Sequence, residues 1–381
     1  MSGYGLEAHG RMIADAPRTD AYARALEVSV RPGCVVLDVG TGSGILAMLA
    51  CRLGARRVYA VEPDDVIQVA RELSAANGMA GRITFIQGLS TEVELPERAD
   101  VLVADVRGAL PLFHGSVATL IDARERLLRP GGAMIPRRER LYAAAVEAPD
   151  AHAGYASPWS DAPYGLDLSA ALGRTLNSWG KARPMPEALL AEPMQWAELD
   201  YRTVTATGAA GVLEMPVLRA GTLHGASAWF ESELAEGVTL STSPLAEPTI
   251  YGTAFFPCAR GVPVRLGDTV HLSIRADAVA GEYVWRWAFR VTRGGALVDE
   301  STHSAFRGAV LTPERLRRRS HLARHALGEA GRIDAFVLGA LDGEATVGRV
   351  AERLRDTFPD AFARWEDAVS RVADLADRYG V

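Results

Sequence analysis

Long apolar runs, cysteine and lysine are scarce in this sequence. No stretch approaches the roughly 18 uncharged apolar residues of a membrane-spanning helix, and the amino terminus lacks the pattern of a secretory signal. Cys34, Cys51 and Cys258 are widely spaced, fit no disulfide framework or zinc pattern, and are expected to be reduced. Lys181 is the only lysine, and a net charge of −6 disfavours general nucleic-acid binding. We therefore expect a cytoplasmic protein with neither membrane nor nucleic acid as partner.

The composition is that of an ordinary globular protein. Hydrophobic residues make up 48% and charged residues 23% of the 381 residues. This length predicts two or three domains, at roughly 150 residues each.

The spacing of apolar residues changes along the chain. From residue 20 to 150, short apolar runs alternate with segments of helical period, which predicts a parallel, doubly wound sheet. The predicted strands cover residues 34–39, 57–61, 83–86, 101–106 and 133–135. From about 200 to 306 the period is two residues, as where Trp285, Trp287 and Phe289 alternate with Arg286 and Arg290. This second region is expected to be an antiparallel sheet or barrel, and the period becomes helical again from 312.

A glycine-rich turn follows the first predicted strand. Asp38 lies near the end of the strand, and Gly40, Gly42 and Gly44 follow with a spacing that differs from that of dinucleotide-binding folds. Glu62 ends the second strand, where a carboxylate can accept hydrogen bonds from both ribose hydroxyls. S-adenosylmethionine fits this set because it contains adenosine but no pyrophosphate. The alternative is a glycine-rich turn in some other α/β protein.

Motifs beyond this turn resemble those of the protein arginine methyltransferases. The matches extend from residue 4 to 306 and read His9-Gly-Arg-Met12, Arg18-Thr19, Val58-Tyr-Ala-Val-Glu62, Glu92-Val-Glu-Leu-Pro96, Leu128-Arg-Pro-Gly-Gly132, Tyr164-Gly-Leu-Asp167, His224-Gly225, Trp229-Phe230 and Ser241-Thr-Ser-Pro244. The resemblance implies a homodimer that uses S-adenosylmethionine. It implies that Arg18 holds the methionine carboxylate of the cofactor, and Ser90 joins the candidate cofactor-binding residues.

The resemblance also suggests a domain organisation. Residues 1–20 are expected to cap the cofactor, 21–140 to form the Rossmann-like methyltransferase domain, and 141–310 to form a β-barrel domain. A dimerisation arm is expected at about 155–195. The tail, 311–381, is expected to be helical, with a faint likeness to winged-helix modules that bind leader peptides. A helical cap or a dimer contact is the alternative for the tail.

The sequence departs from the family in the segment that grips the substrate. The family carries two glutamates on a hairpin, and Asp105 and His114 occupy the matching positions here. A Thr-His-Trp signature reads Thr249-Ile250-Tyr251. A guanidinium prefers planar carboxylate partners, and a histidine does not supply the second anion. These changes argue against methylation of arginine.

The preferred hypothesis is methyl transfer to an oxygen or nitrogen of a small molecule or natural product, including a peptide. His114 is the candidate general base and Asp105 orients it or accepts the proton. Arg107 would pair with a substrate carboxylate or phosphate, and Tyr251 would contact the substrate. Alternatively, His114 is a surface histidine without a role in catalysis, and Arg107 forms a structural ion pair.

Two other functions remain open. One is methylation of free, peptidyl or protein arginine, and the other is a non-catalytic scaffold that binds S-adenosylmethionine. No cluster of cysteine, histidine and acidic residues has metal-ligand spacing, so no metal is expected.

Overall fold

The computed structural model describes residues 5–380, so the first four residues of the predicted cofactor cap lie outside the described range. The chain divides into two compact units, with the boundary between Ala309 and Val310. Each unit is described by itself below.

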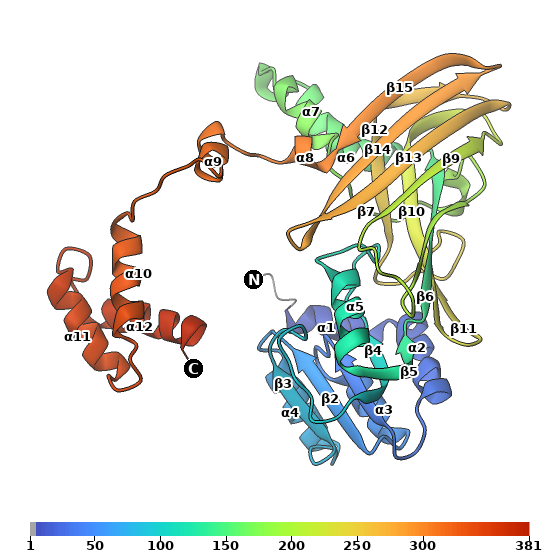
Figure 1. The fold of residues 1–381 in the computed structure, drawn as a ribbon. Helices are drawn as coiled ribbons and strands as arrows, with labels where there is room; N and C mark the ends of the chain where they lie inside the picture. Colours follow the sequence, from blue (N-terminus) through green and yellow to red (C-terminus); the bar gives the residue numbers. More distant parts are fainter. Residues whose placement is uncertain (1–4, 381) are drawn as a thin grey trace. The chain divides into compact units, whose positions relative to one another are not determined.

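The first half of the larger unit is a parallel sheet covered by helices (Figure 1). Its strand order is β3-β2-β1-β4-β5, and every neighbouring pair is parallel. The strands are β1 (Val35–Val39), β2 (Arg57–Glu62), β3 (Ile83–Gln87), β4 (Ala99–Ala104) and β5 (Leu128–Ile135). The helices are α1 (Leu6–Ala14), α2 (Ala16–Ser29), α3 (Ile45–Arg52), α4 (Ile67–Ala76) and α5 (Ser116–Arg126). All five residues of β1 are buried, and all of them except Asp38 are apolar, as expected for a strand that is covered on both faces.

The strand order creates a switch point beside β1. The chain runs outward from β1 through β2 to β3 and then returns to β4 on the opposite side of β1. The crevice at the carboxyl ends of β1 and β4 is therefore where a doubly wound sheet binds its ligand. Asp38 and the glycine turn lie at one of these ends, and Asp105 follows the other.

The second half of the larger unit consists of two antiparallel sheets. One has the order β7-β12-β10-β6-β8 with β11 paired to β10, and the other has the order β15-β14-β13-β9. Its strands are β6 (Arg138–Val146), β7 (Gly180–Ala182), β8 (Met194–Asp200), β9 (Ala209–Pro216), β10 (Gly221–Ala235), β11 (Val238–Ser241), β12 (Thr253–Val264), β13 (Asp268–Val279), β14 (Glu282–Arg293) and β15 (Ala296–Ser304). Its helices are α6 (Pro149–Ser160), α7 (Leu172–Thr175) and α8 (Ala305–Gly308).

The predicted alternation in β14 reports the packing of these sheets. Trp285 and Trp287 are buried and contact Phe256 of β12, with ring centroids 5.2 and 5.3 Å away. Arg286 and Arg290, at the intervening positions, are exposed. The predicted fold class, a parallel α/β sheet followed by an antiparallel barrel, is therefore confirmed.

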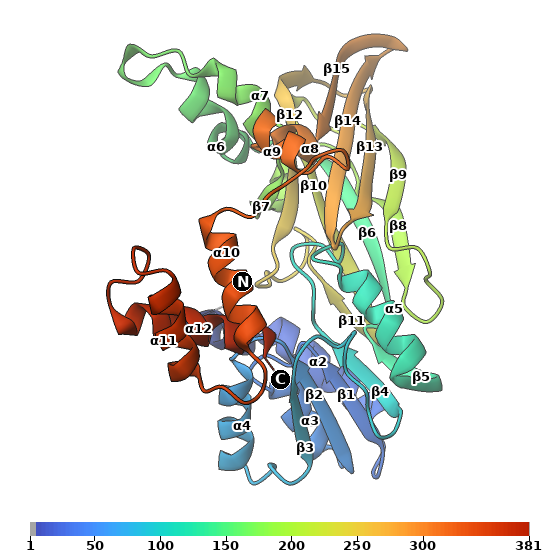
Figure 2. The ribbon, with the colours of Figure 1, turned by 60° about the vertical axis from the view of Figure 1, so that its left-hand side comes forward.

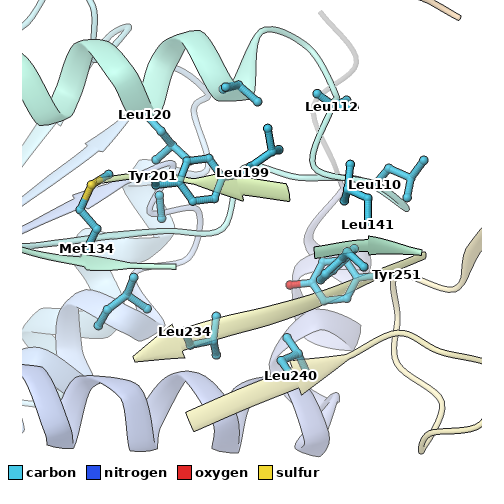
Figure 3. Packing of buried hydrophobic residues seen from close by; sticks show 14 of the residues in the cluster. Leu110, Leu112, Leu120, Met134, Leu141, Leu199, Tyr201, Leu234, Leu240 and Tyr251 are labelled. Carbon is cyan, nitrogen blue, oxygen red and sulfur yellow. The ribbon is translucent and has the colours of Figure 1, made fainter. Parts of the chain in front are cut away.

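One hydrophobic core runs through both halves and anchors the segment that connects β4 to α5. Leu110 and Leu112 are each 1% exposed and belong to the same cluster as Leu141 of β6 and Tyr251 (Figure 3). Because these leucines are fixed in the core, the two ends of the segment, at Asp105 and His114, have defined places.

The smaller unit is a group of helices with a core of its own (Figure 2). It contains α9 (Pro313–Arg318), α10 (Glu329–Ala340), α11 (Val347–Thr357) and α12 (Trp365–Tyr379). Val337, Leu354 and Val372 are fully buried in that core. Residues 310–380 contain no strand, so the described part of the tail has no wing. In neither unit do the described residues include a helix long and apolar enough to cross a membrane.

Candidate active site

A cavity of about 490 Å³ lies at the switch point of the parallel sheet. The glycine turn and Glu62 line one part of it. Asp105, His114 and Tyr251 line another part, and Arg18 lies on the wall as well. The structure thus brings most of the candidate residues to one cavity.

The backbone of the turn requires glycine. Gly40, Gly42 and Gly44 have φ angles of +70°, +54° and +82°, which L-residues with a side chain rarely adopt. A Cβ on Gly40 would lie 2.6 Å from Cγ1 of Val106, and one on Gly42 would lie 3.0 Å from Cε1 of His9. The turn therefore lets a ligand approach the main chain closely.

Two carboxylates lie at the strand ends beside the turn: Glu62 lines the cavity, whereas Asp38 is 1% exposed and is not one of its lining residues. Glu62 accepts hydrogen bonds from the N–H groups of Gly42, at 2.9 Å, and Asp64, at 3.1 Å, which fix its orientation. Asp38 accepts one from the hydroxyl of Thr41 at 2.6 Å, while its buried Oδ1 has no partner among the described residues. Burial raises the pKa of Asp38 to about 7.

This donor and acceptor set fits S-adenosylmethionine. Glu62 matches the ribose hydroxyls, the glycine turn leaves room for the ligand, and the unpartnered Oδ1 of Asp38 matches a hydrogen-bond donor such as the ligand's ammonium group. Ser90 is buried and lines the same cavity.

Asp105 is held by three side chains. Its Oδ2 accepts from Nη2 of Arg18 at 2.5 Å, Nε of Arg18 at 2.6 Å and the hydroxyl of Tyr251 at 2.6 Å. Its Oδ1 accepts from Nε of Arg107 at 3.1 Å. Burial alone would raise the pKa of Asp105, but Arg18, Arg107 and the Tyr251 hydroxyl hold it below its usual value. Asp105 is therefore an ionised carboxylate at the end of β4.

Arg107 is buried among acceptor groups of the chain itself. Its side chain is 4% exposed and pairs with both Asp105 and Glu139. It also donates to the hydroxyls of Tyr22 and Ser232. The guanidinium carbon lies 4.7 Å from the ring centroid of Phe230, within reach of a cation–π contact. Because acceptors of the chain itself surround it, Arg107 is placed as a structural ion pair, the alternative to binding a substrate anion.

His114 lies at the exposed rim of the cavity. Its side chain is 56% exposed, and its Nδ1 lies 2.8 Å from Oε1 of Glu282 at the start of β14. Among the described residues no hydrogen bond or ion pair joins His114 to Asp105. The two candidates therefore line one cavity, but each has its own charged partner.

Sequence reasoning missed the partners that come from distant segments. Glu139, Tyr22 and Ser232 surround Arg107 from three different elements, and Glu282 reaches His114 from the barrel. The only available signal was the two-residue alternation in the barrel strands, which places residues on a face without naming their neighbours. The described residues include no group of three or more His, Cys, Asp or Glu arranged to hold a metal ion.

A parallel sheet with a glycine-lined cavity at its switch point, followed by two antiparallel sheets, defines a methyltransferase domain joined to a barrel. Residues 15–136 match the family model described as ribosomal protein L11 methyltransferase, and residues 137–285 match the arginine methyltransferase oligomerization subdomain. The chain is 31% identical over 303 residues to protein arginine N-methyltransferase 6 of Danio rerio, covering 72% of this chain and 86% of that protein. The chain therefore belongs to the protein arginine methyltransferase family, whose cofactor is S-adenosylmethionine.

Other relatives agree with this assignment. Protein arginine N-methyltransferase 2 of Mus musculus is 35% identical over 286 residues, which are 70% of this chain and 63% of that protein. A probable protein arginine N-methyltransferase 6 of Arabidopsis thaliana is 30% identical over 252 residues, 64% of this chain and 58% of its own length. The chain thus spans less than two thirds of these two relatives. The PRMT1 enzyme–prozyme heterotetrameric complex of Trypanosoma brucei with AdoHcy shares the fold, with a TM-score of 0.72 at 24% identity over 80% of this chain and 98% of that one.

Proposed function

We propose that this protein transfers a methyl group from S-adenosylmethionine to a guanidinium nitrogen of free, peptidyl or protein arginine. Its relatives are named as arginine N-methyltransferases, which supports the arginine alternative over the small-molecule acceptor that the sequence favoured. The single structural observation that supports it is Asp105, a buried carboxylate kept ionised inside the cavity. An anion there can hold and orient a guanidinium.

Each part of the cavity has a defined task in this proposal. Asp38, Glu62, Ser90, Arg18 and the three turn glycines would hold the cofactor. When bound, S-adenosylmethionine supplies an electrophilic methyl group on a good leaving group. The chain then has to align the acceptor nitrogen with that methyl and take up its proton. Asp105 performs the alignment in the proposal, and its fixed position follows from the two arginines that hold it.

A second acceptor class is supported by a different observation. Asp105 already faces two arginines, and His114 stands where the family has its second glutamate. A site with one engaged carboxylate and one imidazole suits a hydroxyl or an amine of a small molecule or peptide, as the sequence suggested. A non-catalytic scaffold would bind cofactor and yield no product.

One experiment separates these functions. The protein is incubated with methyl-labelled cofactor and, in parallel, with free arginine, an arginine-containing peptide, the same peptide with lysine in place of arginine, and a panel of hydroxylated and amine metabolites. Methylarginine after hydrolysis, with no label in the lysine peptide, supports the proposal. Label confined to metabolites supports the second acceptor class, and absence of any product despite cofactor binding supports the scaffold.

We also propose that two copies assemble through the segment at about 155–195. The family model that covers residues 137–285 is described as an oligomerization subdomain, which supports this assembly. Light scattering coupled to size-exclusion chromatography should give twice the 40.8 kDa of one chain. A monomer at micromolar concentration would contradict it.

A further inference from the structure

We propose that Glu282, a residue of the barrel, is a positioning residue for His114. Its carboxylate, which binds the His114 imidazole, takes the place of the second anion that the hairpin lacks. The inference rests on the proposed methyl transfer. Its core observation is the 2.8 Å contact between Oε1 of Glu282 and Nδ1 of His114, on a histidine that lines the cavity. No other ion pair or hydrogen bond engages the Glu282 side chain among the described residues.

The backbone on both sides of this contact is constrained. His114 has a φ of +41° and Gly115 has +68°, so two consecutive residues are left-handed. Opposite them, Ala280 and Gly281 have φ angles of +51° and +82° and form the two-residue turn between β13 and β14. A Cβ on Gly115 would lie 3.4 Å from the carbonyl oxygen of Gly281, which shows how closely the two turns meet.

This arrangement has a cost that ordinary packing does not explain. A left-handed conformation is unfavourable at a residue with a side chain, and an exposed ion pair stabilises the folded state very little. The His114 and Glu282 side chains are 56% and 66% exposed, so their contact does little for folding. Strained residues that persist at the rim of a cavity point to a role in the chemistry there.

The contact fixes which imidazole nitrogen is available. An ionised carboxylate only accepts hydrogen bonds, so in this proposal Nδ1 of His114 carries a proton and its N–H donates a hydrogen bond to Glu282. Nε2 then has a lone pair and accepts a proton, while Glu282 stabilises the imidazolium that forms. The second hairpin position thus has no anion of its own, and the carboxylate of Glu282, on the far side of the His114 ring, takes that place.

Nε2 acts as the base in the methyl transfer. The acceptor nitrogen forms a bond to the methyl carbon while the carbon–sulfur bond breaks, and its electron pair stays on the sulfur. The proton that the acceptor nitrogen loses passes to Nε2 of His114. A hydroxyl acceptor follows the same course, and an ammonium acceptor first gives one proton to Nε2 so that its nitrogen has a lone pair for the methyl carbon. The inference therefore applies to both acceptor classes above.

The test compares two exposed carboxylates of one sheet, each of which lies beside a histidine. Glu282→Gln removes the charge beside His114, and Glu214→Gln removes the charge beside His271, whose Nδ1 lies 3.7 Å from Glu214. We expect Glu282→Gln to lower kcat about tenfold with the cofactor KM unchanged, Glu282→Asp to recover part of kcat, and Glu214→Gln to behave like the wild type. Equal kcat values for Glu282→Gln and the wild type would overturn the inference.

A second measurement needs no turnover. Nitrogen-15 spectra of the histidine-labelled, full-length protein report which ring nitrogen of His114 carries the proton, and His114→Ala assigns the signal. We expect the Nδ1–H form in the wild type and a shift toward the Nε2–H form in Glu282→Gln. If no acceptor is methylated but the wild type and Glu282→Gln show the two expected tautomers, the proposed function fails and the pairing stands. If arginine is methylated but the spectra of the two proteins coincide, the pairing fails and the function stands.

Discussion

The two ends of the cavity are built in different ways. At the cofactor end, the chain's own backbone sets the geometry, since Gly40 and Gly42 adopt left-handed angles and Glu62 is oriented by main-chain N–H groups. At the acceptor end, side chains from several elements set it, because Asp105 and Arg107 are surrounded by α2, β6, β10 and Tyr251. Backbone-built sites are local in sequence, whereas side-chain networks join residues that are far apart.

The acceptor end contains a second contrast. Asp105 is a buried anion between two buried guanidiniums, and His114 is an exposed base with an exposed anion. A buried charge that loses its partner is expensive, while an exposed pair can be broken at little cost to folding. Substitutions at Asp105 should therefore affect stability and activity together, and substitutions at His114 or its partner should affect activity alone.

The largest effect is expected at Asp105. Asp105→Asn keeps the shape but removes the anion that Arg18 and Arg107 share. We expect a loss of about 10²–10³-fold in methyl transfer, measured from initial rates with labelled cofactor. Glu97→Gln, which breaks the exposed pair with Arg56, is the control and should leave the rate unchanged. A variant with normal rates would show that this carboxylate does not face the acceptor.

The next effect concerns Arg107 and separates structure from chemistry. Arg107→Met leaves Glu139 buried without its cation, which should lower the free energy of unfolding by about 3–5 kcal/mol. Denaturant titration of the variant measures this, with the exposed Arg290→Met as control. If stability is unchanged while substrate KM rises, Arg107 binds substrate after all, as the sequence first suggested.

A pH effect is expected from Asp38 in the absence of cofactor. Burial raises its pKa from 3.8 to about 7, so the folded protein retains a proton that the unfolded chain has already released. Stability is then highest below the unfolded pKa and falls as pH rises toward 7, by up to about 4 kcal/mol. Asp38→Asn should flatten this slope between pH 4.5 and 8 in thermal unfolding. Parallel slopes in both proteins would contradict the assignment.

The smallest effect is expected in the glycine turn. Gly40→Ala combines a φ of +70° with a Cβ 2.6 Å from Val106, and we expect about 10–100-fold weaker cofactor binding by calorimetry. Gly78→Ala is the matched control, because Gly78 has a φ of +68° but nothing within 4 Å of the added atom. Equal losses in the two variants would indicate general backbone strain instead of a blocked cavity.

These contrasts explain what the sequence predicted. The glycine turn and Glu62 were found because their spacing is local, and the barrel was found because Trp285, Trp287 and Phe289 alternate with arginines. The burial of Arg107 was missed because its partners Glu139 and Tyr22 lie in other elements.

The contact between His114 and Glu282 at the rim of the cavity was not predicted, for a related reason. No local signal shows that His114 has a positive φ or that a turn in the barrel brings Glu282 to its ring. The preference for a non-guanidinium acceptor rests on the residue types at Asp105 and His114 alone, against the activity of the family that the other motifs resemble.

Arg18 lines the cavity and pairs with Asp105, and a second role for it would have a thermodynamic consequence. In the structure two of its nitrogens are committed to Asp105, while the resemblance assigns it to the cofactor's carboxylate. When an N–H group of Arg18 leaves Asp105 to bind the cofactor, a lone pair of Asp105 becomes free to bind the acceptor substrate. Each ligand then strengthens the binding of the other, and linkage requires the two factors to be equal, so the two should bind cooperatively rather than independently.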